Sequence, residues 1–285
     1  MKQILKIAFA DFWGGFEYNP EGKENYDNVF WRILSERYDL VVSNEPDYLI
    51  FSVFGSSYRN YHCKKILYTG ENMRPNFDSY DFAISFDRMV DNRNCRFPLS
   101  AITLYENNIT DNFEKSKSFE QVKSEKIKFC NFIYSNPNAQ YRNELFTKLS
   151  KYKLVDAGGR VYNNLGYLVS DKLEFQKSYK FSIAFENSEY PGYTTEKIVH
   201  PKLVDSIPIY WGNPDVGLDW NTKSFINAYD YKNIDELVDW IIEVDRNDEL
   251  YRSLVMSSHF VNNKKPKDLD YNNLLDFFES TVIAY

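Results

Sequence analysis

The hydrophobic and polar positions of the chain alternate in blocks that predict strands separated by helices. Short, nearly continuous apolar runs are typical of strands buried inside a parallel sheet. In the first half of the chain these runs lie at residues 4–10, 40–43, 48–53, 65–69 and 82–86. A helix is predicted over 25–38, because Val29, Phe30, Ile33 and Leu34 fall on one of its faces.

The alternation restarts after a charged stretch. Residues 112–128 are rich in Lys, Glu and Ser, which predicts a solvated helix or linker and a domain boundary near position 125. Beyond it, strands are predicted at 129–133, 154–157, 179–185 and 207–211. Helices are predicted at 139–152, 171–178, 195–205, 234–244, 248–258 and, after a proline, 269–283.

This order of elements predicts an α/β protein built from two Rossmann-like domains. The expected domains are 1–125 and 126–265, with a final helical segment at 266–285 that packs back on the first domain. Ligands of open α/β sheets bind outside the carboxyl ends of the strands, so we expect a cleft between two such edges. Many unrelated functions share this plan, and the fold alone does not select one.

Composition and charge narrow the class of ligand. The 285 residues carry a net charge of −7, which argues against a general nucleic-acid binder. A phosphate group would therefore be bound by a few placed cations. Aromatic residues make up 18% of the chain and suit the C–H faces of sugars, although an AT-rich genome accounts for most of this excess.

The cysteines and the N-terminal residues indicate the compartment. Cys63, Cys95 and Cys130 are odd in number and widely spaced, which argues against a disulfide framework and against zinc. A reducing compartment fits best. The first residues contain no secretory hydrophobic region, and no apolar run approaches the length of a membrane span. We therefore expect a cytoplasmic protein without a transmembrane segment.

The most informative segment is 185–197, with the sequence FENSEYPGYTTEK, where a strand, a polar loop and a helix follow one another. Thr194 or Thr195 can cap the helix, so that Glu196 and Lys197 fall in its first turn. A helix N-terminus suits a phosphate, and Lys197 would add a full positive charge there. Glu196 can accept hydrogen bonds from ribose hydroxyls. An ordinary capped helix explains the same pattern equally well.

Three other polar side chains follow predicted strands. Asn187 can donate to a phosphate or to the sugar. Arg142 lies in the first turns of the helix after the polar loop 135–138, where its guanidinium can fork onto a diphosphate. Glu71 follows the strand 65–69 and can act as a general base at the edge of the first domain. A surface position without function is the commoner role of a single Arg or Glu.

Several kinds of catalytic site are absent from the sequence. His62, His200 and His259 lack the spacing of metal ligands, and the chain contains no nucleophile elbow and no P-loop. A single Asp-x-Asp pair, Asp268 and Asp270, lies away from any predicted strand and is interpreted as acids at a helix start. A nucleotide bound at the helix start of 195–205 is therefore expected to bind without an obligatory metal.

The segment 185–197, together with IPIYWG at 207–212, resembles the α1,3/4-fucosyltransferases of glycosyltransferase family 10. The similarity is greatest to the bacterial members that make Lewis-type antigens, and it runs in order from about residue 5 to about residue 280. Further matches are Trp13-Gly14, 34–38, 68–72, 135–136 with 142–143, and 164–167.

The resemblance implies a GT-B fold with an N-terminal acceptor domain and a C-terminal donor domain. It implies inverting transfer of L-fucose from GDP-β-L-fucose to O3 of N-acetylglucosamine in N-acetyllactosamine-type glycans, giving a Lewis x type product. Glu71 matches the general base and Glu17 an acceptor-binding residue. The donor-binding candidates, including two threonines at the helix start, are Ser135, Asn136, Arg142, Val169, Lys172, Asn187, Tyr193, Thr194, Thr195, Glu196 and Lys197.

Several alternatives stay open on the sequence. The acceptor can be a type 1 chain, free glucose or a polysaccharide repeat, and a transferase of the same fold can use another nucleotide sugar. A non-catalytic glycan-binding or scaffold protein is a third reading. The tail up to Tyr285 has neither the heptad repeats nor the basic amphipathic helices of some bacterial members. Peripheral contact with the inner face of the membrane and the oligomeric state are left open.

Overall fold

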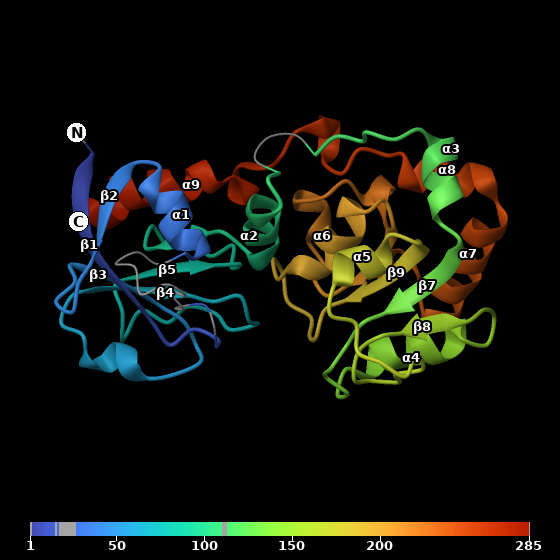
Figure 1. Ribbon diagram of the computed structural model, residues 1–285, viewed down its shortest axis with the longest axis horizontal. Coiled ribbons are helices and arrows are strands. Elements are labelled where there is room, and N and C mark those ends of the chain that lie inside the picture. Colours follow the sequence, from blue (N-terminus) through green and yellow to red (C-terminus); the bar gives the residue numbers. More distant parts are fainter. Residues whose placement is uncertain (1, 15, 17–26, 110–112, 285) are drawn as a thin grey trace. The chain divides into compact units, whose positions relative to one another are not determined.

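A computed structural model describes residues 2–14, 16, 27–109 and 113–284. The chain divides into two compact units (Figure 1). The first unit comprises Met1–Thr110 and Lys267–Tyr285, and the second comprises Asp111–Pro266. Each unit contains one sheet of parallel strands with helices packed on it, so the α/β class predicted from the sequence is confirmed.

The sheet of the first unit has six parallel strands in the order β2-β1-β3-β4-β5-β6. Their bounds are β1 Gln3–Ala10, β2 Tyr38–Val42, β3 Tyr48–Phe51, β4 Lys64–Tyr68, β5 Phe82–Ser85 and β6 Asn94–Arg96. The register places Ile7 of β1 beside both Val42 and Tyr48. The five apolar runs of the first half all form strands. Strand β6 was not predicted, because its sequence Asn-Cys-Arg has no hydrophobic period.

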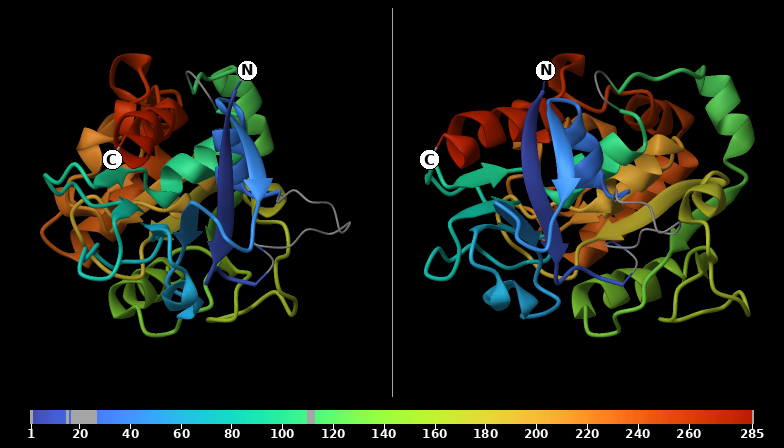
Figure 2. Two further views of the ribbon diagram at one scale, coloured as in Figure 1. Left: turned by 90° about the vertical axis from the view of Figure 1, so that its left-hand side faces the viewer. Right: turned by 60° about the vertical axis from the view of Figure 1, so that its left-hand side comes forward.

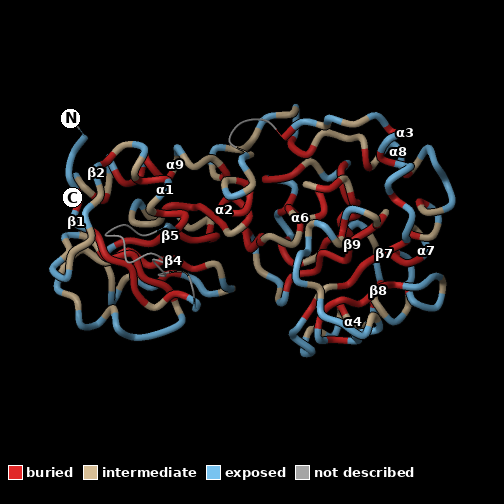
Figure 3. The backbone as a smooth tube through the Cα atoms, in the orientation of Figure 1, coloured by how far each residue is buried: buried red, intermediate tan, exposed pale blue. Residues whose placement is uncertain are grey.

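The two faces of this sheet are covered differently. Three helices, α1 (Val29–Ser35), α2 (Leu99–Glu106) and α9 (Tyr271–Phe277), lie on one face (Figure 1). The other face is covered by the short helix η1 (Ser57–Asn60) and by loops. Aromatic side chains from these segments pack on small and aliphatic strand residues; they are Tyr58, Tyr61, Phe77 and Tyr80. The buried strands and exposed loops of this arrangement are seen in Figure 3.

Helix α1 is shorter than the predicted helix 25–38. Asn28 caps it, with its side chain accepting a hydrogen bond from Trp31 N at 2.9 Å. The helix ends at Ser35, and Tyr38 already pairs with Gln3 as the first residue of β2. The predicted C-terminal boundary was therefore wrong, because strand pairing takes Tyr38 out of the helix. Residues 25 and 26 lie outside the described residues.

The C-terminal segment packs on the first unit (Figures 1 and 2). A short turn, η6 (Lys267–Leu269), precedes α9, which continues into a π-helical turn, η7 (Phe278–Ile283). Helix α9 contacts α1, α2 and β6. On its surface, Arg37 pairs with Asp276 at 2.8 Å and with Glu279 at 2.9 Å. The buried apolar side chains of this segment include Leu274 and Leu275 of α9 and Phe278 and Val282 of η7.

The sheet of the second unit has five parallel strands in the order β11-β10-β9-β7-β8. Their bounds are β7 Lys128–Phe132, β8 Val155–Ala157, β9 Tyr179–Phe185, β10 Ile207–Trp211 and β11 Ile226–Asn227. The bounds predicted for β9 and β10 are confirmed without change. Strand β11 was not predicted, since two residues are too short to show a period.

In the described part of the second unit, the α-helices around this sheet are α3 Phe119–Glu125, α4 Gln140–Leu149, α5 Lys172–Gln176, α6 Glu196–Leu203, α7 Ile234–Arg246 and α8 Asp248–Val255. Short 3-10 turns lie at η2 Val216–Leu218, η3 Thr222–Ser224, η4 Ala228–Asp230 and η5 Val261–Asn263. Helices α3, α4, α7 and α8 share one hydrophobic core with the strands. Helix α6 packs on β9 and β10, next to α5.

The charged stretch before β7 belongs to the second unit. Ser118 caps helix α3 in a capping box: its hydroxyl accepts a hydrogen bond from Gln121 N, and the Gln121 side chain accepts one from Ser118 N. Phe119 and Val122 of this helix are buried in the core of the second unit. The structural division therefore falls between Thr110 and Asp111, before the stretch, whereas the sequence placed it near position 125.

Candidate functional site

A pocket of about 480 Å³ opens at the carboxyl ends of β7, β8 and β9 in the second unit. This volume suits a small-molecule ligand. Predicted donor-binding residues that line it are Ser135, Asn136, Val169, Lys172, Asn187, Glu196 and Lys197. Its other lining residues are Ile133, Tyr134, Gly158, Gly159, Arg160 and Leu168. The two sequence segments that follow β7 and β9 therefore meet in one wall.

Helix α6 starts at this pocket. Thr195 is its N-cap, and the Thr195 hydroxyl accepts a hydrogen bond from Lys197 N at 3.5 Å. Glu196 and Lys197 lie in the first turn, as predicted. Thr194 is not the cap: it is buried and accepts a hydrogen bond from Asn213 Nδ2 at 2.9 Å. Although Lys197 N and Thr195 N already donate within the protein, the dipole of the helix start favours an anion in the pocket.

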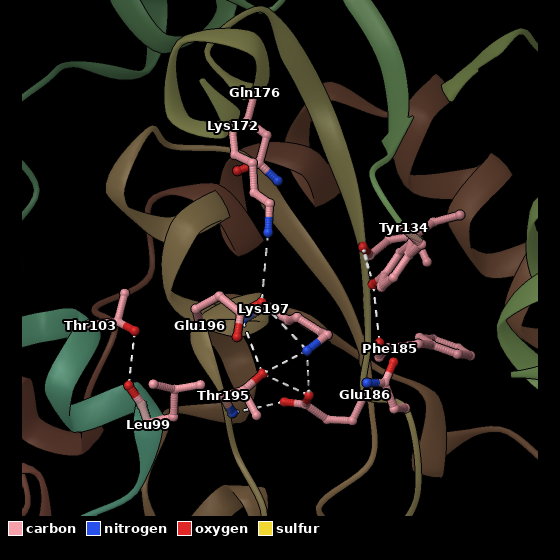
Figure 4. Close-up of polar contacts among 12 residues, drawn as sticks. Leu99, Thr103, Tyr134, Lys172, Gln176, Phe185, Glu186, Thr195, Glu196 and Lys197 are labelled. Atoms are coloured by element: carbon pink, nitrogen blue, oxygen red, sulfur yellow. Dashed lines mark hydrogen bonds and ion pairs between the residues drawn. The ribbon is translucent and has the colours of Figure 1, made fainter. Parts of the chain in front are cut away.

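Lys197 is paired on two sides (Figure 4). Its Nζ lies 3.2 Å from Glu186 Oε2, 3.5 Å from Glu196 Oε1 and 3.0 Å from the Thr195 hydroxyl. Burial favours the neutral amine, but the two carboxylates outweigh it and raise the pKa of Lys197. The ammonium is therefore protonated, as the sequence predicts, and two neighbouring carboxylates partly offset its charge.

Glu196 faces the pocket between two lysines. Its carboxylate lies 3.9 Å from Lys172 Nζ as well as beside Lys197. Burial opposes its ionisation, but Lys197, Lys172 and His200 overcome this effect and lower the pKa of Glu196 to about 2. Glu196 is thus an ionised hydrogen-bond acceptor at any working pH, which suits ligand hydroxyl groups.

Arg142 does not line the pocket. It is 1% exposed, and its guanidinium lies 3.7 Å from the centre of the Tyr134 ring. Its Nη1 donates to Asn187 Oδ1 at 3.0 Å, and its Nη2 donates to the Asn136 carbonyl at 2.8 Å. The guanidinium of Arg142, which we expected to bind a diphosphate, therefore binds protein oxygens. In this arrangement Arg142 holds two lining residues in place from behind the wall.

The loop between β9 and α6 is fixed from beneath by Asn213, a residue that the sequence did not single out. Asn213 is fully buried and its Oδ1 accepts a hydrogen bond from Gly192 N at 2.7 Å. Gly192 has a φ of 85°, which favours glycine. Tyr193 is also buried, and its carbonyl accepts a hydrogen bond from the Tyr210 hydroxyl at 3.3 Å. Tyr193 therefore supports the loop and is not part of the pocket wall.

Glu186 is a second residue that sequence reasoning missed. It is fully buried and accepts hydrogen bonds from Thr195 N at 2.9 Å and from the Thr195 hydroxyl at 2.7 Å. Burial raises its pKa, and Lys197 and Thr195 oppose this change. The available signal was a carboxylate directly after an apolar strand, in the same motif as Lys197. Such a group needs a buried cationic partner.

The glycine pair after β8 allows a close backbone approach at the pocket. A Cβ on Gly159 would overlap the backbone of Tyr134, so no larger residue fits while this packing is kept. Arg160, the next residue, is exposed and lines the pocket. The sequence predicted a strand end at the two glycines but gave no role to Arg160.

Glu71 lies in the first unit, directly after β4 at the carboxyl edge of that sheet. It is exposed, and its carbonyl accepts hydrogen bonds from the Thr69 hydroxyl at 3.0 Å and from Met73 N at 2.7 Å. Within the described part of the chain its carboxylate has no hydrogen-bond or ion-pair partner. Glu17, the expected acceptor-binding residue, lies outside the described residues.

The structure also bears on metals, thiols and membranes. Among residues 2–14, 16, 27–109 and 113–284, no group of His, Cys, Asp or Glu side chains is arranged to hold a metal ion. Asp270 caps α9 and Asp268 pairs with Arg96 at 3.2 Å, so the interpretation of the Asp-x-Asp pair as acids at a helix start is confirmed. The three cysteines are free thiols. No described helix has the length and apolar character needed to cross a membrane.

Comparison with protein families places both halves of the chain. Residues 7–105 match the N-terminal domain of alpha-(1,3)-fucosyltransferase FucT. Residues 123–268 match the C-terminal domain of glycosyltransferase family 10 (fucosyltransferase). The second match contains all residues of the pocket described above.

Curated relatives agree with these families. The alpha-(1,3)-fucosyltransferase FucT of Helicobacter pylori is 35% identical over 321 aligned residues, which cover 98% of this chain and 66% of the relative. The alpha-(1,3)-fucosyltransferase B of Drosophila melanogaster is 34% identical over 139 residues, covering 44% of this chain and 31% of the relative. The chain thus spans just under two thirds of the bacterial relative and about a third of the insect one.

Solved structures show the fold. A crystal structure of an alpha1,3-fucosyltransferase with GDP-fucose superposes with a TM-score of 0.79 at 32% identity, over 98% of this chain and 90% of the other. The Anabaena protein HepE with UDP-glucose gives a TM-score of 0.54 at 10% identity, over 99% and 100% of the chains, and supports the fold alone. The chain has the GT-B fold of nucleotide-sugar-dependent glycosyltransferases. It belongs to glycosyltransferase family 10, the fucosyltransferase family, so the resemblance seen in the sequence is confirmed.

Proposed function

We propose that the chain is an inverting α1,3-fucosyltransferase that moves L-fucose from GDP-β-L-fucose to O3 of N-acetylglucosamine in N-acetyllactosamine-type glycans. The observation that carries the proposal is the pocket of the second unit, where Asn187, Glu196 and Lys197 of the family 10 domain converge at a helix start. A relative of 32% identity over nearly the whole chain has been solved with GDP-fucose.

The donor side rests on charge. Around the helix start lie three cations, Arg142, Lys172 and Lys197, against two carboxylates, Glu186 and Glu196, so the cluster keeps a net positive charge. A single cation about 4 Å from a phosphate contributes on the order of 4 kcal/mol at an effective dielectric near 20. Lys197 contributes less because two carboxylates already face it. The diphosphate is therefore stabilised jointly by Lys172, Lys197 and the helix N–H groups, in a preorganised setting.

The acceptor side rests on Glu71. Its carboxylate takes the proton from the acceptor hydroxyl while that oxygen attacks C1 of fucose and GDP departs from the opposite face. A positioned general base contributes about 10²–10⁴-fold to the rate. At the same sheet edge, exposed Trp13 and Phe54 follow β1 and β3 and contact each other edge to face at 6.1 Å. Such aromatic faces suit the C–H surfaces of a glycan.

An acceptor panel tests this proposal. The chain is incubated with GDP-fucose and N-acetyllactosamine, lacto-N-biose, lactose, glucose or a polysaccharide repeat, and release of GDP is measured. We expect turnover with N-acetyllactosamine and an α1,3 linkage in the product by NMR. Turnover with another acceptor, or an α1,4 linkage in the product, would support the fucosyltransferase activity and contradict the proposed acceptor or linkage. Absence of GDP release with every acceptor would favour a non-catalytic glycan-binding protein.

Donor binding and metal dependence are tested separately. Calorimetry is expected to show GDP-fucose binding far more tightly than GDP-mannose or UDP-glucose. The reverse order would favour a transferase of the same fold with another nucleotide sugar. Our proposal also includes transfer without an obligatory divalent metal, because Lys172, Lys197 and the helix start supply the positive potential. Activity that EDTA abolishes and magnesium or manganese restores would contradict that part.

A further inference from the structure

Glu186 sits behind the nucleotide pocket and touches the residues that form it. It does not line the pocket, whereas Glu196 and Lys197 do. Its two oxygens accept hydrogen bonds from the backbone and hydroxyl of Thr195 and bind the ammonium of Lys197 (Figure 4). One carboxylate thereby joins the end of β9, the cap of α6 and the first cation of that helix. A buried ionised group of this kind is tolerated only when such partners surround it.

The neighbouring strand leaves room for this side chain. Gly212 follows β10 with a φ of 141°, and a Cβ there would overlap Cβ and Cγ of Glu186. The backbone of Glu186 is fixed as well, because its N–H donates to the Trp211 carbonyl at 2.8 Å. The glycine that ends the IPIYWG segment and the glutamate of the FENS segment thus fit each other. The position of the Glu186 carboxylate is determined from the strand side as tightly as from the helix side.

We infer that Glu186 is a positioning residue for the nucleotide: it holds the Lys197 ammonium and the start of helix α6 at the pocket wall. The inference rests on the proposed function, since it assumes a diphosphate at Lys197. Glu186 acts through Lys197 and does not contact the ligand itself. Ligand oxygens can replace Glu196 beside the ammonium, while Glu186 retains its hold from the opposite side.

The surrounding charges define what a pH experiment measures. Lys197 faces Glu186, Glu196, Tyr134 and Tyr193, and the pKa of Lys197 is raised because the two carboxylates outweigh burial. Other charged or titratable groups that reach this cluster are Lys172 on α5, His200 on α6 and Arg142 on α4. Removal of the Glu186 charge removes the first of the two carboxylates that stabilise the ammonium. The pKa of Lys197 then falls, because only Glu196 of the two carboxylates is left to oppose the effect of burial.

The test compares E186Q and E186D with a matched control, E189Q. Glu189 is an exposed carboxylate in the same loop. GDP affinity is measured by calorimetry between pH 7 and pH 9.5, relative to the wild type at each pH, which cancels the titration of the nucleotide. At pH 7 we expect E186Q to bind GDP about tenfold more weakly than the wild type, and any alkaline loss of binding to begin at a lower pH. In E186D the charge remains and the reach is shorter, so GDP binds about tenfold more weakly without a shifted alkaline limb. E189Q should match the wild type.

Each outcome decides the inference. An E186Q profile that coincides with E189Q at every pH would overturn it, provided that the wild type binds GDP. Should E186Q fail to fold, E186D decides alone: wild-type affinity would overturn the inference, and a tenfold loss would support it. A G212A variant, which displaces Glu186 without altering any charge, is expected to weaken GDP binding in the same way as E186D. Absence of GDP binding by the wild-type chain would instead refute the proposed function, and the inference with it.

Discussion

The carboxyl edges of the two sheets are built in different ways. In the second unit the polar side chains at the edge are tied together: Glu186 holds Thr195 and Lys197, and Arg142 holds Asn136 and Asn187. In the first unit the candidate base Glu71 is exposed, and only its backbone carbonyl is fixed by neighbours. One edge is ordered before any ligand arrives, while the functional group of the other edge is held loosely.

This difference indicates which unit is preorganised to bind its ligand. A charged diphosphate is bound strongly by dipoles and cations that do not have to rearrange, and the second unit meets this requirement. A general base needs its final geometry only when the acceptor hydroxyl is present, and a flexible carboxylate meets that requirement. The two units should therefore respond to mutation in separable ways. Changes in the second unit should alter nucleotide affinity, whereas a change of Glu71 should alter turnover and leave nucleotide affinity as it is.

The largest expected effect separates the two edges outright. Glu71→Gln should lower kcat by about 10²–10⁴-fold, since proton removal is lost. GDP affinity should stay within error of the wild type, because Glu71 belongs to the first unit. Stopped or continuous assays of GDP release give kcat, and calorimetry gives the affinity. Wild-type turnover in this variant would remove Glu71 from the reaction.

The next effect is expected at Lys197. Lys197→Ala should weaken GDP binding about 10²-fold, because a cation beside the diphosphate is lost. It should also destabilise the protein by about 3–5 kcal/mol, since Glu186 is left buried without its cation. The double variant Glu186→Gln/Lys197→Met should regain stability in chemical denaturation without regaining GDP affinity. Recovery of both together would show that stability alone limits binding.

A smaller effect is expected at Arg142. Arg142→Lys keeps the charge but loses the planar fork that binds the carbonyl of Asn136 and the side chain of Asn187. GDP affinity should fall about tenfold, at nearly unchanged kcat with saturating substrate. Arg252→Lys is the matched control, because Arg252 on α8 is exposed and does not line the pocket. If both variants behave alike, the buried fork is not needed for the pocket.

The smallest effect concerns stability against acid. His259 of the second unit is 1% exposed and packs on Phe113, and burial together with Lys115 and Lys202 holds its pKa well below the ordinary value. The unfolded chain takes up this proton below about pH 6.5 and the folded chain does not, so stability present above that pH is lost as the pH falls.

The acid dependence is measured by denaturation at several pH values. Between pH 7 and pH 5.5 the loss attributable to His259 is about 1 kcal/mol. His259→Phe should flatten this part of the profile. The control is His62→Phe in the first unit, where the histidine is exposed, and it should leave the slope unchanged. Equal slopes in the wild type and His259→Phe would contradict the prediction.

Much of the fold could be predicted from the sequence because hydrophobic periods report burial directly. Strands β9 and β10 were predicted with their observed bounds. Helix α2 was missed because Ser100 to Leu104 are all buried, so this helix has no polar face to mark its period. Strands β6 and β11 were missed because they are short and carry polar residues, and only their pairing with β5 and β10 defines them.

The residues of the candidate site could be predicted from the sequence, but the hydrogen bonds and ion pairs between them could not. The strand, loop and helix order of 185–197 and the homologous motifs placed Asn187, Glu196 and Lys197 in one pocket. The partial neutralisation of Lys197 and the inward fork of Arg142 depend on how side chains from separate strands and helices turn toward each other. A single sequence carries no record of those directions, and the buried Glu186 was therefore overlooked.

The return of α9 to the first unit makes the second unit an insertion within the first. During synthesis the sheet of the first unit emerges early, yet the helix whose Phe277 packs on Phe82 of that sheet is made only after the whole second unit. The inserted unit has all its strands available before that point and can fold first. A chain shortened before α9 would thus present the intact pocket of the second unit attached to an uncovered, aggregation-prone sheet face.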